Sequence, residues 1–268
     1  MRNQVDLEPL PACGPPRANR AKRRLATGGV ASVVAGHSMG ADSIDFLGPF
    51  GFDGVWLEAE HGPADWERLG DLSRACDLWS LSALMRLRRM DASLVARALT
   101  LGVHGIVIPQ VKSPEEARSL VDAAKFAPVG QRSVSRGRRS YANPDFLARD
   151  NDETLLVVQL EDPEVLEICE DIAAIEHLDV AFIAPNDLAQ AMGYQGQPDH
   201  PKVVAAIEDG LRRIAAVGGA VPGTFCKADA APRLIQLGVR FLYVSYDAWI
   251  AQAGGEWLRG LREADARS

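Results

Sequence analysis

The sequence predicts a (β/α)₈ barrel, an α/β fold, and three observations support this prediction. Eight short segments rich in Val, Ile and Leu recur along the 268 residues, and each has the length of a buried strand. Segments with helical periodicity lie between them, and glycine stands where such a helix ends before a strand. The chain length is close to the ~250 residues typical of this fold. A doubly wound open sheet is the second possibility, but no GxGxxG turn follows the first strand.

The eight apolar segments are expected to form the barrel strands in chain order. They span residues 29–36, 53–58, 81–87, 104–111, 154–161, 179–185, 219–226 and 240–247. Two stretches, LGVHGIVIP (101–109) and LGVRFLYVS (237–245), are nearly the same unit of helix end, glycine and strand. Such a repeated unit predicts stacked βα pairs in one continuous domain.

Two helices between the strands carry clear start signals. Ser113 is expected to cap a helix that begins at Pro114, with Glu116 completing a capping box. Asp91 is expected to cap the preceding helix. Residues 1–16, which are rich in proline, are expected to form a disordered tail, and residues 17–268 a single barrel domain. The basic run at residues 17–24 favours a solvated first helix over a nucleic-acid-binding arm.

Composition and charge exclude several classes of protein. Hydrophobic residues make up 47% and charged residues 24% of the chain, as in ordinary globular proteins. The net charge of -7 argues against nucleic-acid binding. No segment approaches the ~20 apolar residues of a membrane span, and the N-terminus lacks the apolar run of a secretory signal. Because the four cysteines show no CxxC pair or metal-ligand spacing, a cytoplasmic protein is predicted.

Polar side chains stand at the end of one predicted strand after another. They are Glu58, Glu60, His61, Arg86, Gln110, Gln159, Glu161 and Asp187. In a (β/α)₈ barrel the active site lies at the carboxyl ends of the strands. We therefore expect these side chains to meet at one mouth of the barrel. Of the other histidines, only His37 is placed near the mouth, whereas His104 begins a strand at the opposite face.

Glu161 and Asp187 are the best candidates for metal ligands. Carboxylate oxygens suit a hard divalent cation such as Mg²⁺ or Mn²⁺, which keeps water or takes substrate oxygens in its other positions. The alternative is that each carboxylate caps the helix that follows it, since Asp162-Pro163 also has the form of a helix start. The presence of two carboxylates at adjacent strands favours a metal site.

Arg86 and His61 are candidates for chemistry at the same mouth. A guanidinium there would bind a carboxylate or stabilise an enolate oxygen, although an ion pair at the barrel rim is the simpler alternative. His61 could transfer a proton at neutral pH, with Glu58 and Glu60 in support. The long segment 127–152 adds Arg132, Arg136, Arg138 and Arg139, which form either a solvated surface run or a basic loop over the mouth that attracts an anionic substrate.

Several motifs resemble those of the HpcH/HpaI family of class II, metal-dependent pyruvate aldolases, which includes 4-hydroxy-2-oxoheptanedioate and 2-dehydro-3-deoxyglucarate aldolases. The resemblance covers residues 17 to 255 and rests on GFDGVWLEAEHGP, LMRL, VIPQVKSPEEAR, FAPVGQRS, VVQLED and FIAPNDLAQAMGYQGQPDHP. It implies a barrel of the phosphoenolpyruvate/pyruvate-binding type, a homohexamer or other homo-oligomer, and reversible cleavage of a 4-hydroxy-2-oxo acid to pyruvate and an aldehyde. The reaction would pass through a pyruvate enolate at Mg²⁺, Mn²⁺ or Co²⁺.

The resemblance also implies roles for individual residues. Glu161 and Asp187 would bind the metal, Arg86 would stabilise the enolate and His61 would serve in proton transfer. Substrate binding would involve Gln159, Ala184, Pro185, Asn186 and Asp187. Three positions depart from the family pattern, namely Glu58, Ala184 and Thr100. Thr100 replaces an acid that family members present to the histidine of a neighbouring subunit, and Glu58 is the candidate to replace it.

Two other functions are compatible with the same residues. A related enolate lyase could act on a CoA thioester, although the EHGP and GYxGxP motifs belong to the aldolase branch. The chain could also be a barrel that binds metal and keto acid without turnover, and Thr100 is the residue that favours this reading. The aldehyde partner is not specified by the motifs, and we expect residues 131–146 and a neighbouring subunit to select it.

Overall fold

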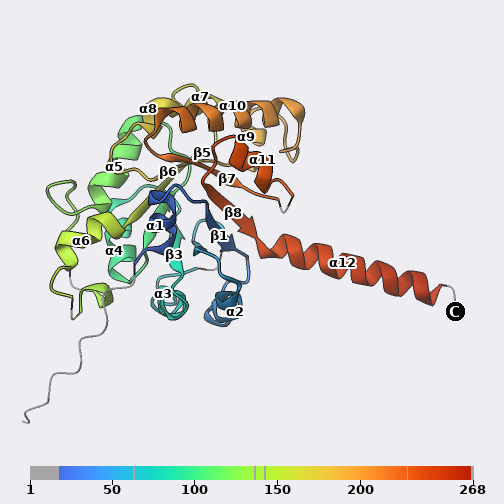
Figure 1. The fold of residues 1–268 in the computed structure, drawn as a ribbon, viewed down its shortest axis with the longest axis horizontal. Coiled ribbons are helices and arrows are strands. Elements are labelled where there is room, and N and C mark those ends of the chain that lie inside the picture. The colour runs from blue at the N-terminus through green and yellow to red at the C-terminus, as the bar shows by residue number, and fades with distance from the viewer. Residues whose placement is uncertain (1–17, 63, 136, 142, 228, 267–268) are drawn as a thin grey trace, which may run out of the picture.

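The computed structural model confirms the predicted (β/α)₈ barrel. It describes residues 18–62, 64–135, 137–141, 143–227 and 229–266. Eight parallel strands form a closed ring in chain order, and β8 pairs with β1 to complete it (Figure 1). The predicted boundary between a tail and the barrel at residues 16 and 17 lies outside the described residues.

Each predicted apolar segment contains one strand of the barrel. The strands are β1 (Ala31–Ala35), β2 (Gly54–Glu58), β3 (Ser82–Arg86), β4 (Gly105–Ile108), β5 (Leu155–Leu160), β6 (Val180–Ile183), β7 (Val221–Phe225) and β8 (Phe241–Ser245). The helices are α1 (Arg20–Ala26), α2 (Ala41–Leu47), α3 (Leu69–Leu78), α4 (Ala92–Thr100), α5 (Pro114–Ala124), α6 (Phe146–Glu153), α7 (Pro163–Leu166), α8 (Cys169–Ala173), α9 (Pro185–Ala191), α10 (Pro201–Val217), α11 (Ala231–Gln236) and α12 (Tyr246–Asp265), with 3₁₀ turns η1 (Gly48–Phe50) and η2 (Arg138–Ser140).

The strands are buried on both faces, which explains their uninterrupted apolar runs. Side chains that point inward, among them Trp56, Leu84 and Phe182, fill the barrel. A second and larger core lies between the strands and the outer helices. Helix α1 closes the amino-terminal end of the barrel, where Ala21 is fully buried and its N–H donates to the Ser82 hydroxyl at 3.0 Å.

Local signals in the sequence fix the helix ends. Asp91 accepts hydrogen bonds from the N–H groups of the first turn of α4, and Ser113 accepts one from the Glu116 N–H. The Glu116 carboxylate, however, binds the N–H of Lys112 rather than that of the cap residue. Gly102 and Gly238 precede β4 and β8 with φ of 104° and 95°, a backbone conformation that favours glycine.

The arginine-rich segment lies at the amino-terminal face of the barrel, and both predictions for it are wrong. It connects α5 to β5, so it must end where β5 begins, opposite the mouth. Arg132 and Arg139 bind Asp150 at 2.7 and 3.0 Å, and Arg138 pairs with Asp77. The Arg132 and Asp150 side chains are only 2% and 1% exposed. The side chains of Arg132 and Arg139 are therefore largely buried, Arg138 is paired with an acid although its side chain is 31% exposed, and none of the three faces the mouth. Arg136 lies outside the described residues.

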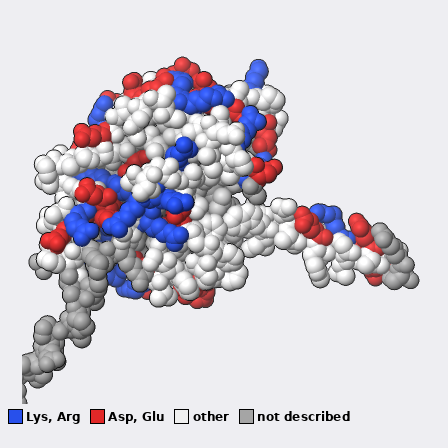
Figure 2. Space-filling model, in the orientation of Figure 1, with Lys and Arg blue, Asp and Glu red and all other residues white. Residues whose placement is uncertain are grey.

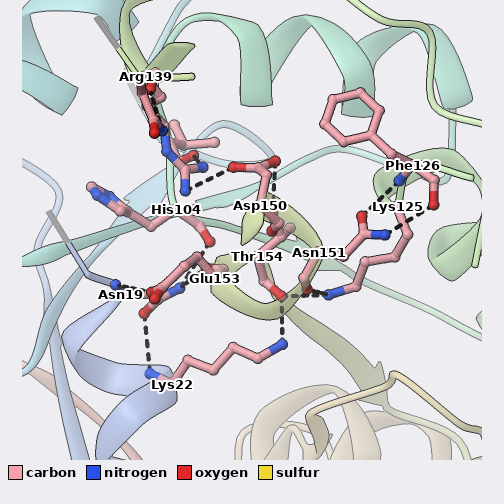
Figure 3. Close-up of polar contacts among 12 residues, drawn as sticks. Asn19, Lys22, His104, Lys125, Phe126, Arg139, Asp150, Asn151, Glu153 and Thr154 are labelled. Carbon is pink, nitrogen blue, oxygen red and sulfur yellow. Dashed lines mark hydrogen bonds and ion pairs between the residues drawn. The ribbon is translucent and has the colours of Figure 1, made fainter. Parts of the chain in front are cut away.

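A polar network joins this segment to α1 (Figure 3). The Asn19 amide donates to the carbonyl oxygens of His104 and Glu153, both at 2.9 Å. Lys125 is buried, and its Nζ donates to the Asn151 and Thr154 carbonyls. The expectation that His104 belongs to the face opposite the mouth is confirmed by its position before β4.

Helix α1 is largely exposed to solvent, as the sequence predicts, and its cations pair with acids of the barrel. Arg20, Lys22 and Arg23 pair with Asp53, Asp179 and Glu153 respectively. Figure 2 shows blue and red side chains close together on this face of the molecule. The basic run therefore holds α1 against the barrel. No helix in the described parts of the chain is long and apolar enough to cross a membrane.

Candidate active site

The carboxyl ends of the strands surround a cavity of about 300 Å³ at the barrel mouth. The cavity is lined by Trp56, His61, Arg86, Gln159, Phe182, Ala184, Pro185, Asn186, Asp187, Phe225 and Tyr243. Side chains two residues apart on a strand point to the same side, so Trp56 and Glu58 both face inward from β2. Glu58 is the register partner of Arg86 on β3. Most of the residues singled out in the sequence therefore meet here.

Arg86 is the centre of a hydrogen-bonded network in this cavity. Its Nε and Nη2 lie 2.7 and 2.6 Å from Oε2 of Glu58. Its Nη1 lies 3.1 Å from Oε2 of Glu60 and 3.2 Å from Oε1 of Gln159. Burial alone would lower the pKa of Arg86, but the hydrogen bond and charge of Glu58 outweigh burial and raise it. The predicted rim ion pair is present, and the guanidinium also faces the cavity.

Glu58 holds the end of β2 and the turn that follows it. Burial would raise its pKa, but the contacts with Arg86 lower it, so the group is a carboxylate. Oε1 accepts the N–H groups of Glu60 and His61 at 2.8 and 3.1 Å, and Oε2 accepts Trp56 Nε1–H at 3.3 Å. These contacts compensate the cost of burying the Glu58 carboxylate at the strand end, whereas burial raises the pKa of Glu60 despite the opposing charge of Arg86.

His61 extends from this turn into solvent, with its side chain 68% exposed. Its Nε2 lies 3.7 Å from Oε2 of Glu60. Glu58 binds only the main chain of His61, so Glu60 is the carboxylate beside the ring. The prediction that Glu58 orients the imidazole is therefore wrong, and Glu60 lies next to the ring instead. His37 instead bonds Asp247, with Nδ1 3.1 Å from Oδ2 and a side chain 87% exposed, and it does not line the cavity.

Glu161 lies just beyond β5 with 9% of its surface exposed. Burial raises its pKa to about 7, and the negative charges of Asp187 and Glu60 add to the shift, against the opposing charge of Arg86. The N-cap positions of α7 and α9 are Asp162 and Ala184, and neither side chain makes a capping hydrogen bond, so neither Glu161 nor Asp187 serves as the cap that was the alternative. The two carboxylates lie near enough to repel each other, which a bound cation would relieve.

The residues fit a divalent metal bound by two protein carboxylates. Among the described residues, no group of three His, Cys, Asp or Glu side chains is arranged to hold an ion. Mg²⁺ and Mn²⁺ accept a site of one or two carboxylates when water or substrate supplies the remaining oxygens. The open cavity beside Asp187 leaves room for such ligands.

The predicted substrate-binding residues lie where β6 leads into α9. Ala184, Pro185, Asn186 and Asp187 line the cavity at the beginning of α9. Gln159 is 2% exposed and is fixed by its bond to Arg86. Gln110 is exposed just after β4 with φ of 54°, and its backbone opposes the rise in the pKa of Glu161. Gln110 therefore acts on Glu161 through its main chain and not through its side chain.

Four aromatic residues in the cavity wall were missed in the sequence analysis. They are Trp56, Phe182, Phe225 and Tyr243. The motifs and the run of polar residues at strand ends do not include them, because they lie at inward positions of the strands. Alternation along β2 and β8 could have found Trp56 and Tyr243, because each shares the inward face of its strand.

Comparison with known proteins identifies the family. Residues 37–251 match the model of the family described as HpcH/HpaI aldolase/citrate lyase. The chain is 34% identical over 245 residues to a pyruvate aldolase of Rhizobium etli, covering 90% of this chain and 96% of that one. It is 38% identical over 201 residues to a hydroxypyruvate/pyruvate aldolase of Deinococcus radiodurans, covering 74% and 73%. The crystal structure of an HpcH/HpaI aldolase from Desulfitobacterium hafniense superposes with a TM-score of 0.85 at 26% identity, covering 92% and 98%.

These comparisons agree with the motifs and the barrel. They confirm the prediction of an aldolase-type lyase, because both curated relatives are aldolases and span most of this chain. The match to the family model extends from just after β1 into α12 and so includes nearly the whole barrel. The chain belongs to the HpcH/HpaI aldolase/citrate lyase family.

Proposed function

We propose that this chain is a metal-dependent aldolase that reversibly cleaves a 4-hydroxy-2-oxo acid to pyruvate and an aldehyde. The observation that carries the proposal is the position of Arg86, in one cavity with Asp187 and close to Glu161. Retro-aldol cleavage transfers an electron pair to the keto-acid fragment, which must be stabilised as an enolate. A site with a guanidinium and two acidic metal ligands meets this requirement.

Glu161 and Asp187 would hold the divalent cation, for which we propose Mg²⁺, Mn²⁺ or Co²⁺. When bound, the cation supplies Lewis-acid stabilisation of negative charge on the keto-acid oxygens. The donor set of two carboxylates excludes none of the three ions. Removal of the metal by EDTA is therefore expected to abolish turnover.

The remaining roles belong to side chains and amides around the cavity. Arg86 stabilises the enolate oxygen, and Gln159 fixes the guanidinium and orients the keto acid. The backbone N–H groups of Asn186 and Asp187, in the first turn of α9, hold the substrate carboxylate. His61 transfers the proton through water, since its ring is exposed and has Glu60 beside it.

The test is pyruvate release, coupled to lactate dehydrogenase, from a panel of 4-hydroxy-2-oxo acids. Each substrate is assayed with Mg²⁺, Mn²⁺ or Co²⁺ and again with EDTA. We expect release that depends on the metal and is lost in Glu161→Ala. Release that continues at full rate in EDTA, or in Glu161→Ala, would contradict the proposed site. CoA thioesters in the same panel test the related lyase activity.

A second function, a barrel that binds keto acid without turnover, is favoured by Thr100, which stands where family members have an acid. Its hydroxyl donates to the Ala96 carbonyl at 2.8 Å and lies 2.8 Å from that of Ser135. Thr100 ends α4, at the face opposite the mouth, so it cannot reach His61 of its own chain. Binding of pyruvate with metal but no release from any substrate would support this second function.

We also propose that the protein is a cytoplasmic homo-oligomer that binds neither nucleic acid nor membrane, and α12 supports the assembly. In Figure 1 this helix projects away from the barrel, and only Tyr246 of its residues is buried. Trp257 and Leu261, one turn apart, are 67% and 51% exposed. An apolar cavity of about 470 Å³ beside the start of α12 includes Phe46 and Phe50. Exposed apolar surfaces of this kind mark protein interfaces, and a second copy of the chain is the proposed partner.

The assembly is tested by sedimentation velocity of the full chain. We expect an oligomer for the wild type and smaller species for the double variant Trp257→Glu and Leu261→Glu, because two carboxylates would enter the apolar interface. The control is Arg259→Glu, which changes charge on the same helix. A monomeric wild type, or a double variant with unchanged sedimentation, would contradict the proposed role of α12.

A further inference from the structure

The cavity at the barrel mouth has a polar side and an aromatic side. The polar side includes Arg86 from β3, Gln159 from β5 and Asp187 after β6. On the aromatic side, the ring of Tyr243 on β8 lies 5.0 Å from that of Trp56 and 5.8 Å from that of Phe225, measured between centroids. These contacts hold the Tyr243 ring in place, and β8 is adjacent to neither β5 nor β6 in the ring of strands.

The hydroxyl of Tyr243 has an unusual position within this wall. Tyr243 lines the cavity, and the structure gives its hydroxyl no hydrogen bond to any described residue. Burial raises the pKa of Tyr243 to about 12, with a further contribution from the charge of Glu58 and an opposing one from Arg86. The phenol therefore keeps its proton at neutral pH and can act as a donor. The side chain is only partly buried and lines the cavity, so a bound substrate is able to supply the hydrogen-bond partner of the hydroxyl.

We propose that the Tyr243 hydroxyl donates a hydrogen bond to the substrate oxygen on the carbon that becomes the aldehyde. This inference rests on the proposed function, which places the keto-acid half against Glu161 and Asp187. The rest of the substrate must then extend from that half toward the other walls of the mouth, and β8 supplies one of them. Tyr243 would be a catalytic residue of the aldehyde half, distinct from Arg86 and the carboxylates of the keto-acid half.

The chemistry gives this hydrogen bond a purpose. In cleavage, the bond between C3 and C4 breaks and its electron pair passes to the keto-acid fragment. The C4 hydroxyl loses its proton and becomes the aldehyde carbonyl, so negative charge develops on its oxygen. A fixed donor at that oxygen stabilises the transition state more than the ground state. Tyr243 keeps its own proton throughout. The proton of the C4 hydroxyl passes through water to His61, and a proton is returned to C3 of the enolate to give pyruvate.

Tyr243→Phe tests the proposal because it removes only the hydroxyl and leaves the ring in contact with Trp56. The matched control is Tyr246→Phe, whose hydroxyl lies 2.9 Å from that of Ser38 and outside the cavity lining. Two rates are measured with metal present. One is kcat for cleavage of a 4-hydroxy-2-oxo acid, and the other is exchange of the pyruvate methyl protons in D₂O, followed by NMR without aldehyde.

For Tyr243→Phe we expect kcat for cleavage to fall about 10- to 100-fold, the loss of one hydrogen bond to a charged group. Pyruvate exchange should stay within about twofold of wild type, since the keto-acid half is untouched, and the control should change neither rate. Unchanged cleavage, or an equal loss in both rates, would overturn the assignment to the aldehyde oxygen. A wild-type protein that shows neither cleavage nor exchange would contradict the proposed function itself.

Discussion

Arg86→Lys is expected to lower kcat/KM for pyruvate release about 10²- to 10³-fold, the typical loss when one preorganised donor to an oxyanion is removed. In the native guanidinium, Nε and Nη2 contact Glu58, and Nη1 contacts both Glu60 and Gln159. Lysine keeps the positive charge but has a single nitrogen on a flexible stem. It can pair with one carboxylate, but it cannot keep both carboxylates paired and also present a donor to the substrate. Most of the loss should therefore appear in kcat.

The matched control is Arg88→Lys, two residues further along the chain. Arg88 is exposed, and its Nε donates to the Ala59 carbonyl at 3.2 Å. We expect less than a threefold change in kcat/KM for this variant. Thermal melts of both variants separate loss of chemistry from loss of structure. If Arg86→Lys melts like the wild type and keeps its full rate, Arg86 is only an ion-pair partner for Glu58 and Glu60.

The fold could be predicted because the determining features are local. Runs such as LLVVQL, which is β5, are buried on both faces and therefore read as uninterrupted apolar segments. Gly102 and Gly238 mark the return of a helix to the next strand. The candidate site could be predicted for a related reason. A closed parallel barrel brings all strand ends together, so Arg86 and Gln159 meet although they are far apart in sequence.

Other features depend on partners that local sequence does not reveal. The sequence shows a basic run that includes Arg132, Arg138 and Arg139. In the fold these side chains pair with Asp150 and Asp77. The charge of a segment does not specify the acid that it will meet. Chain direction was the usable clue, because a connection from α5 to β5 has to end at the amino-terminal face.

The aromatic wall was missed for a different reason. Tyr243 and Trp56 are large aromatic residues at inward positions, and most such residues in a barrel belong to its hydrophobic core. Phe241, two residues before Tyr243, is fully buried in this role. What distinguishes Tyr243 is its depth, since it lies nearer the mouth than Phe241 on the same strand. The period of two along a strand predicts which side a residue faces, but the depth of the cavity requires the structure.

Glu161→Gln is expected to weaken binding of Mn²⁺ at least about 100-fold, because the loss of a direct ligand should exceed the 10- to 100-fold cost of removing groups around a metal site. In the wild type the pKa of Glu161 is raised to about 7, first by burial and then by Asp187 and Glu60. Below that pH the metal must displace a proton. Affinity should therefore rise with pH, by up to tenfold per unit, until about pH 7 and then level off. Glu161→Gln should lose this dependence because glutamine does not titrate.

The titration is followed by isothermal calorimetry from pH 5.5 to 8 without substrate, so the result is independent of turnover. Glu164→Gln, an exposed residue in the first turn of α7, is the matched control and should bind Mn²⁺ like the wild type. Stability gives a second check. A folded pKa above the unfolded value means that the metal-free protein loses stability as pH rises from about 4.5 to 7. The melting temperature of metal-free Glu161→Gln at pH 8 should therefore exceed that of the wild type. Equal affinity for Mn²⁺ in wild type and Glu161→Gln would place the metal elsewhere, because a direct carboxylate ligand cannot be neutralised without weakening the binding of the cation.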